Sequence, residues 1–275
     1  MTSTNNLSDT STWLPLDGLE PGFDENRADP TNALEGAEIV TANSSGFKVT
    51  HRFKTDTVHW SYPADDGTVH HRDGTYEAYL VDTELYYVQI HPEDRGSQSA
   101  SLFLDVRDGV GLCVIAEIQD PAPGQVRVQH RFIPFTIAGQ ARLAEPPAPT
   151  NELIGRRAYW RYSKVHAYEH VYLSPQWYSW HCLAGPEKGL ADTDEQTTYK
   201  LREDVYVFTW REKVIPCASV TVADHRDHSA LRSHGVLFGL NEDESDTIHF
   251  TFGAHGAVLS QSVYPSDLDP RNCHT

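Results

Sequence analysis

The stretch Phe47-Lys48-Val49-Thr50-His51-Arg52-Phe53 decides the fold class, because apolar and polar side chains alternate along it. A period of two is typical of a β-strand with one buried face. Turn residues follow at 54–56, and similar short apolar runs separated by turns continue through the first half, at 58–60, 75–80, 85–90, 101–106 and 112–118. Closely spaced short strands without a long helical period predict an all-β sandwich or barrel.

The same pattern restarts after a proline-rich stretch at 145–150, which we interpret as a semi-rigid linker. The second half has apolar runs at 158–162, 168–173, 178–183, 197–201, 205–212, 218–223 and 235–240. The halves also correspond in order: the run beginning at Val58 parallels that beginning at Tyr178, and the run at Leu85 parallels that at Val205, both 120 residues later. The run at 102–105 parallels 221–224 at an offset of 119.

A steady offset predicts a tandem repeat. Two barrels, or two halves of one larger β structure, both satisfy it, and we favour two barrels because closure removes exposed strand edges. The expected organisation is a loosely ordered lead-in at 1–35, a barrel at 36–145, a linker at 146–150, a second barrel at 151–265 and a tail at 266–275.

The charge balance argues against two classes of partner. Asp and Glu number 39 against 22 Lys and Arg, a formal charge of −17. A field of that sign repels phosphate backbones and anionic lipids, so we expect neither nucleic acid nor a membrane as partner. The polar N-terminus lacks the features of a signal peptide, and no apolar run is long enough for a membrane helix, which predicts a cytoplasmic protein.

Several motifs fail on context. The four cysteines lie far apart without a C-x-x-C pair, which argues against a structural zinc site or a disulfide framework. Gly109-Val110-Gly111 lies between predicted strands and not before a helix, so it does not predict a nucleotide cradle. His166-Ala-Tyr-Glu-His170 fits the H-x-x-E-H pattern of zinc proteases, but the flanking alternation predicts a strand, which would separate the histidines by about 13 Å.

A second histidine cluster follows the predicted strand at 218–223. Its members His225, His228 and His234 accompany Asp224 and Asp227. Imidazole and carboxylate suit several divalent metals. We favour instead a turn-like loop that carries surface histidines, and we expect no metal site.

The strongest chemical candidate is the run 205–212, where alternation places Tyr206, Phe208, Trp210 and Glu212 on one face. If that face lines a barrel interior, aromatic walls surround the carboxyl group of Glu212, and burial raises the pKa of such a group toward general acid/base use. The alternative is that the aromatics fill a core and Glu212 lies in water at a strand end. From the residues alone, both interpretations remain open.

From residue 151 onward the chain resembles the MoaF family. The resemblance is carried by residues 152–155, 161–163, 166–170, 187–194 and 206–213, and more weakly in the first half by 74–78 and 101–105. The family name refers to molybdenum cofactor synthesis, but the sequence contains no phosphate-binding loop or metal-ligand set that would indicate that role.

The same C-terminal stretch is similar to phenolic acid decarboxylases, small lipocalin-like barrels that need no cofactor. This resemblance implies two lipocalin-like (calycin) antiparallel barrels. It also implies that Glu212 and Tyr162 occupy two of that family's four functional positions. The other two positions fall on Trp160 and Leu190, where the family has a tyrosine and an arginine, so decarboxylation of a hydroxycinnamate is not implied.

We therefore expect a lyase or isomerase that uses acid/base chemistry, without cofactor or metal, on a small aromatic or unsaturated hydrophobic molecule in the second barrel. Glu212 and Tyr162 are the expected catalytic residues. The expected substrate-binding residues are Trp160, Trp180, Cys182, Lys188, Tyr206, Phe208 and Trp210. The alternative function is a non-catalytic binding or sensing protein for a hydrophobic small molecule, and a homodimer is left open in either case.

Overall fold

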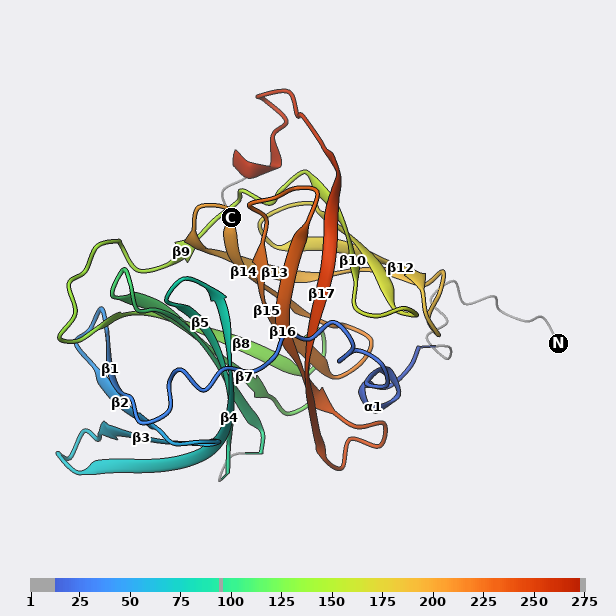
Figure 1. Ribbon diagram of the computed structural model, residues 1–275. Helices are drawn as coiled ribbons and strands as arrows, with labels where there is room; N and C mark the ends of the chain where they lie inside the picture. The colour runs from blue at the N-terminus through green and yellow to red at the C-terminus, as the bar shows by residue number, and fades with distance from the viewer. Residues whose placement is uncertain (1–12, 94–95, 273–275) are drawn as a thin grey trace.

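The structure, a computed structural model that describes residues 13–93 and 96–272, consists of two antiparallel β-barrels that lie side by side (Figure 1). In the first barrel, strands β1 to β8 follow one another in chain order, and the pairing of β1 with β8 closes it. In the second barrel, β10 to β17 do the same, and every neighbouring pair is hydrogen bonded, including β10 with β17 and β12 with β13. Two separate barrels are thus confirmed, and a single larger β structure is excluded.

The strands of the first barrel are β1 (Glu38–Asn43), β2 (Lys48–Phe53), β3 (Thr57–Pro63), β4 (Val69–Asp82), β5 (Leu85–Pro92), β6 (Gln98–Asp105), β7 (Val110–Ile118) and β8 (Val128–Ile137). Those of the second barrel are β10 (Arg156–Arg161), β11 (Ala167–Tyr172), β12 (Trp177–Ala184), β13 (Ala191–Arg202), β14 (Val205–Arg211), β15 (Cys217–Asp224), β16 (Leu231–Leu240) and β17 (Thr247–Gln261). Within the proline-rich stretch, β9 (Ala148–Pro149) pairs with β13. The described helices are α1 (Leu16–Leu19) and the short 3₁₀ helix η1 (Pro270–Asn272), and neither is long and apolar enough to span a membrane.

The repeat extends to the backbone. The three matched pairs of runs fall on the third, fifth and sixth strands of each barrel. The hairpins β4–β5 and β13–β14 each turn through a residue with positive φ, Glu84 at 54° and Asp204 at 51°, which lie 120 residues apart. Both hairpins also shift register just before the turn, between Leu80 and Asp82 and between Lys200 and Arg202.

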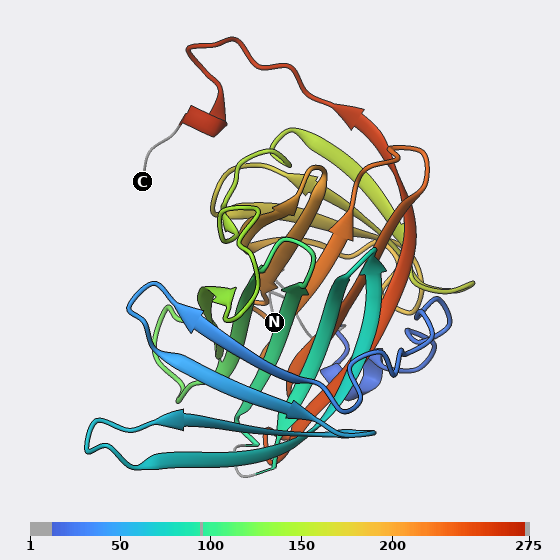
Figure 2. The same ribbon diagram turned by 60° about the vertical axis from the view of Figure 1, so that its left-hand side comes forward.

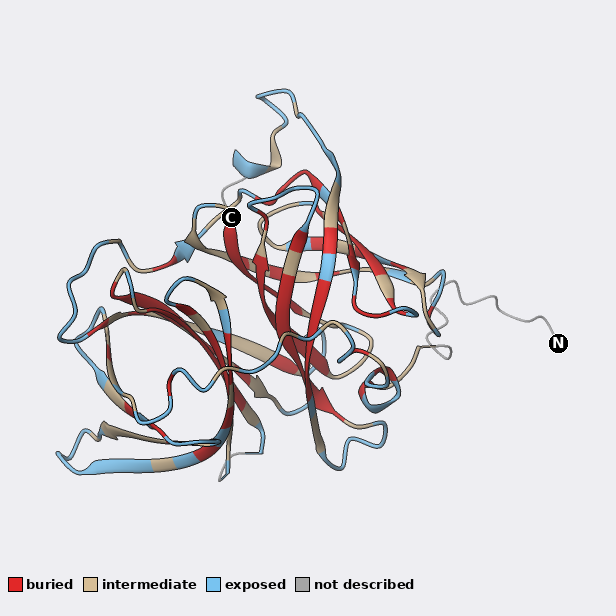
Figure 3. Ribbon diagram, in the orientation of Figure 1, coloured by how far each residue is buried: buried red, intermediate tan, exposed pale blue. Residues whose placement is uncertain are grey.

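The barrels share an apolar interface built from equivalent strands. Four residues on β4 and β5 and their counterparts 120 positions later on β13 and β14 belong to one cluster: Tyr79 and Tyr199, Val81 and Leu201, Leu85 and Val205, Tyr87 and Val207. Figure 3 shows that buried segments concentrate where the barrels meet. At the rim, Arg202 bonds Asp82 and Asp105, each at 2.7 Å. The interface therefore joins the barrels into one folding unit.

Residues 13–23, here called the plug, pack against the second barrel. The sequence predicts a loosely ordered lead-in over residues 1–35, and that prediction does not include these contacts. Leu16, Leu19 and Phe23 are buried in the same cluster as the aromatic interior of that barrel. Figures 1 and 2 show this blue segment, with α1, beside the orange and red strands β16 and β17. The sequence between the plug and β1 then crosses to the first barrel, where Leu34 is buried.

Candidate active site in the second barrel

Strand β14 positions the central carboxyl group. Its even-numbered aromatics Tyr206, Phe208 and Trp210 are buried in the second barrel, whereas Val205 and Val207 are buried against the first. Glu212 follows directly after the strand and continues the inward face. Although the residue as a whole is partly exposed, its carboxyl Oε2 is buried. Alternation thus predicts the inward orientation of this run.

Glu212 lies against a second acid, Asp194. In the β13–β14 register Glu195 pairs with Arg211, so Asp194 comes opposite Glu212 at the next step. Burial, followed by the charge of Asp194 and a hydrogen bond with it, raises the pKa of Glu212 well above its usual range. Burial also raises the pKa of Asp194. Two buried carboxyl groups this close do not both ionise readily, and the raised pKa of Glu212 favours its protonated form.

Indole groups fix both acids. Trp180 donates from Nε1 to Asp194 Oδ2 at 2.8 Å, and the backbone N–H of Lys213 donates to Oδ1 at 3.2 Å. Trp210 donates from Nε1 to Glu212 Oε1 at 2.9 Å. These donors hold the oxygens in place while leaving the proton of the pair available for transfer.

A third buried acid, Glu187, lies in the same cavity. Tyr168 donates its hydroxyl proton to Glu187 Oε2 at 3.0 Å, and the backbone N–H of Leu14 in the plug donates to Oε1 at 3.3 Å. Burial raises the pKa of Glu187. The plug is therefore joined to the site by a polar contact as well as by apolar packing.

The cavity around these acids has a volume of about 60 Å³. At ~30 Å³ per molecule in the liquid, that holds roughly two waters. The plug residues Trp13, Leu19 and Phe23 form one of its walls, and Trp13 meets Trp180 edge-on at 5.2 Å between ring centroids. The remaining lining residues are Tyr162, Tyr168, His170, Tyr178, Trp180, Glu187, Trp210, Glu212, Ile215, Cys217 and Leu237.

Four of the expected site residues line this cavity, namely Glu212, Tyr162, Trp180 and Trp210. Burial raises the pKa of the Tyr162 hydroxyl, which keeps it protonated. Its ring lies 5.0 Å from that of Phe23 in the plug. The expected acid and the expected tyrosine are thus brought to one cavity.

The other five expected residues lie elsewhere. Trp160 and Phe208 are buried deeper in the barrel, and Cys182 Sγ contacts the carbonyl of Ala184 at 3.4 Å. Tyr206, near the start of β14, donates to Glu152 at 2.8 Å. Lys188 is exposed in the connection between β12 and β13.

Asp194, Glu187, Tyr168, Tyr178 and Cys217 were not among the expected site residues. Asp194, Gln196 and Thr198 are all buried along β13, but the run 192–198 is polar on both faces, so its sequence does not indicate which residues point inward. Glu187 lies in a loop, where alternation does not apply. The plug contacts join residues more than 100 positions apart, which local patterns do not report.

The histidines divide into separate environments. His166 directly precedes strand β11 and His170 lies within it, in keeping with the predicted strand. His166 meets the carbonyl of Pro21 at 3.0 Å, and burial lowers the pKa of His170 to about 3. The interpretation of 225–234 as a loop of surface histidines is wrong for two members. His225 is fully buried in the second barrel, and His234 is buried between the barrels, where its Nε2 accepts from Ala28 N at 2.7 Å.

Comparison with known proteins supports both halves. Residues 11–120 match the MoaF N-terminal domain and residues 147–262 match the MoaF C-terminal domain. Protein MoaF of Klebsiella aerogenes is 30% identical over 188 residues, covering 64% of this chain and 71% of the relative. A crystal structure from Burkholderia vietnamiensis, provisionally assigned as a beta-lactamase, is 13% identical and covers 41% of this chain and all of its own, with a TM-score of 0.33. The similarity to phenolic acid decarboxylases stays a prediction, whereas the two domain matches and the curated relative show that the chain belongs to the MoaF family.

Proposed function

We propose that the second barrel is the active site of a lyase or isomerase that acts by acid/base chemistry on a small aromatic or unsaturated hydrophobic molecule. The observation that carries the proposal is the Glu212–Asp194 pair, two buried carboxyl groups among aromatic side chains, where burial and the charge of Asp194 raise the pKa of Glu212. A carboxyl group whose pKa is raised toward neutrality is an effective general acid, and a positioned acid contributes ~100–10,000-fold in rate. Glu212 gives its proton to the substrate, and Tyr162 orients it from the same cavity.

Substrate entry requires the plug to move. A cavity of about 60 Å³ does not hold an aromatic molecule, and three of its lining residues belong to residues 13–23. Withdrawal of Trp13, Leu19 and Phe23 exposes the aromatic walls and frees Glu187 from Leu14. The plug then returns over the bound substrate and excludes water from the acid pair, which strengthens electrostatic interactions there.

Exchange of hydrogen at carbon tests the proposal whichever direction the reaction takes. The full-length protein is incubated in D₂O with small aromatic and unsaturated compounds, and proton NMR follows product formation or deuterium incorporation. Glu212→Gln keeps the shape of the side chain and removes the transferable proton, so we expect turnover to be lost. The matched control is Glu203→Gln, at an 82% exposed side chain in the β13–β14 hairpin, which we expect to retain full activity. Unchanged turnover in Glu212→Gln would refute the proposal.

The competing function is binding without turnover in the same barrel. The observation that favours it is the packing of the plug against the cavity, since a binding protein also benefits from a segment that lies over its ligand. Saturable binding of a compound without any deuterium incorporation or product, in the wild-type protein, would favour this second function.

A further inference from the structure

A second cavity lies inside the first barrel, away from the acid pair. Its volume is about 360 Å³, six times that of the cavity around Glu212. Ligand pockets in proteins begin at ~300 Å³, and at ~30 Å³ per water this one holds roughly twelve. Its size therefore suits a small organic molecule without any movement of the chain.

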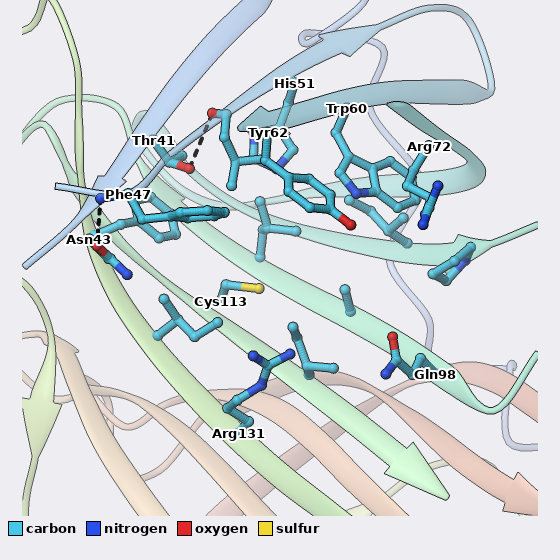
Figure 4. Close-up of a pocket in the computed structure, with 18 of the residues that line it drawn as sticks. Thr41, Asn43, Phe47, His51, Trp60, Tyr62, Arg72, Gln98, Cys113 and Arg131 are labelled. Atoms are coloured by element: carbon cyan, nitrogen blue, oxygen red, sulfur yellow. Dashed lines mark hydrogen bonds between the residues drawn. The ribbon is translucent and has the colours of Figure 1, made fainter. Parts of the chain in front are cut away.

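The walls of this cavity are mostly apolar and partly aromatic. Phe47, Trp60 and Tyr62 contribute rings (Figure 4). Phe135 and aliphatic residues such as Ile133 also line the cavity. Flat rings among aromatic and aliphatic walls favour a ligand with a planar apolar body.

The charged side chains that line the cavity, among the residues that the structure describes, are Arg72 and Arg131, although the chain as a whole carries a formal charge of −17. His51 adds a neutral polar group, because burial lowers the pKa of its ring to about 4. Its Nδ1 is buried without a hydrogen-bond partner among residues 13–93 and 96–272.

Arg131 is the cation best placed to hold a ligand. Along β8, Arg131, Ile133 and Phe135 share the inward face, and Figure 4 shows the Arg131 guanidinium pointing into the cavity beside Cys113. Within the described part of the chain it forms no ion pair or hydrogen bond, in contrast to Arg202 and Arg211, which bond to carboxylates. A guanidinium offers a planar set of donors that matches a carboxylate in a bidentate geometry.

We propose that the first barrel binds a small planar carboxylate, with the carboxylate on Arg131 and the apolar body among Trp60, Tyr62 and Phe135. This site is separate from the acid/base site of the second barrel. The two barrels thus have different interiors: the second contains a pair of buried carboxyl groups, and the first contains the guanidinium of Arg131.

Isothermal titration of the full-length protein with 2-naphthoate, and with the uncharged 2-naphthamide of the same shape, tests the proposal. We expect saturable binding of naphthoate at one site per chain, and weaker binding of naphthamide. Arg131→Met keeps the aliphatic stem and removes the charge. We expect it to weaken naphthoate binding about tenfold or more while changing naphthamide binding little, since charge-assisted hydrogen bonds are the strong ones.

Three further variants complete the test. Arg131→Lys keeps the charge and should retain the preference for naphthoate. Arg52→Met removes a charge from the outer face of β2, in the same barrel but outside the cavity. This variant should bind naphthoate as the wild type does. Glu212→Gln should also bind as wild type does, so the failure of either site is seen separately. No saturable naphthoate binding, equal binding of naphthamide, or an Arg131→Met variant with wild-type affinity would each overturn the proposal.

Discussion

Replacing Glu212 by glutamine should make the protein more stable, and increasingly so as the pH rises. In the native state burial and Asp194 hold the pKa of Glu212 well above its usual range, whereas in the unfolded chain the pKa returns to about 4.3. The native state therefore keeps a proton that the unfolded state releases, and stability is lost as the pH rises above about 4.3. Glutamine has no such proton, and its amide N–H can donate to Asp194 in place of the carboxyl.

The size of the effect follows from proton linkage. One retained proton changes the free energy of unfolding by about 1.4 kcal/mol per pH unit, so from pH 5 to pH 8 the gain of Glu212→Gln over wild type rises by up to about 4 kcal/mol. A native pKa that falls within this interval gives a smaller rise.

Urea unfolding at several pH values, followed by the fluorescence of the six tryptophans, measures this difference. Glu203→Gln is the control, and we expect its difference from wild type to stay constant with pH, because its side chain is exposed. A difference between Glu212→Gln and wild type that does not change between pH 5 and pH 8 would show that Glu212 is ionised in the native protein, and the shared proton would have to be abandoned.

Two further predictions concern the plug and the interface. Phe23→Ala removes a buried ring whose centroid lies 5.0 Å from that of Tyr162 and 5.8 Å from that of Phe250. We expect a loss of about 3–5 kcal/mol in the free energy of unfolding and greater quenching of tryptophan fluorescence by acrylamide, whereas an unchanged stability would contradict the packing of the plug. Arg202→Met leaves Asp105, whose side chain is 3% exposed, without its cation, so we expect urea unfolding to show a loss of about 3–5 kcal/mol in the free energy of unfolding. Arg142→Met, at the exposed pair with Glu145, should lose less than about 1 kcal/mol, and equal losses in the two variants would contradict a stabilising role of the Arg202 ion pairs.

The β class and the two halves were predictable because alternation reports burial on one face. The missed strands have physical reasons. Strand β8 contains Pro134, and β17 contains Gly253 and Gly256, and both residue types are depleted in strands. At Gly256 a Cβ would lie 2.3 Å from the carbonyl oxygen of Tyr159, so the close approach of β10 requires glycine where the sequence pattern expects a strand-forming residue.

The candidate site was predictable in part for the same reason. Trp210 lies on a regular strand and Glu212 directly follows it, and the alternation places both inward. Asp194, the acid paired with Glu212, was not predictable in this way. It lies opposite Glu212 across the β13–β14 pair, and the register between two strands cannot be read from the sequence of one strand. The volume of the cavity in the second barrel also depends on the plug, which lies outside that barrel in the sequence. The alternation of the strands in the first barrel does not indicate how large a cavity they enclose.

The interface between the barrels has a consequence for how they differ. Equivalent strands of the two barrels contribute to it, with Tyr79 and Tyr199, and Leu85 and Val205, in one apolar cluster, so that similar surfaces from the two halves are buried together. Two identical chains joined in this way would have identical interiors and would separate on dilution. Because one chain carries both halves, their association is intramolecular and independent of protein concentration. Each interior is also free of the other's constraints, so one contains acids and indoles while the other encloses a cavity of about 360 Å³ whose lining includes Arg131.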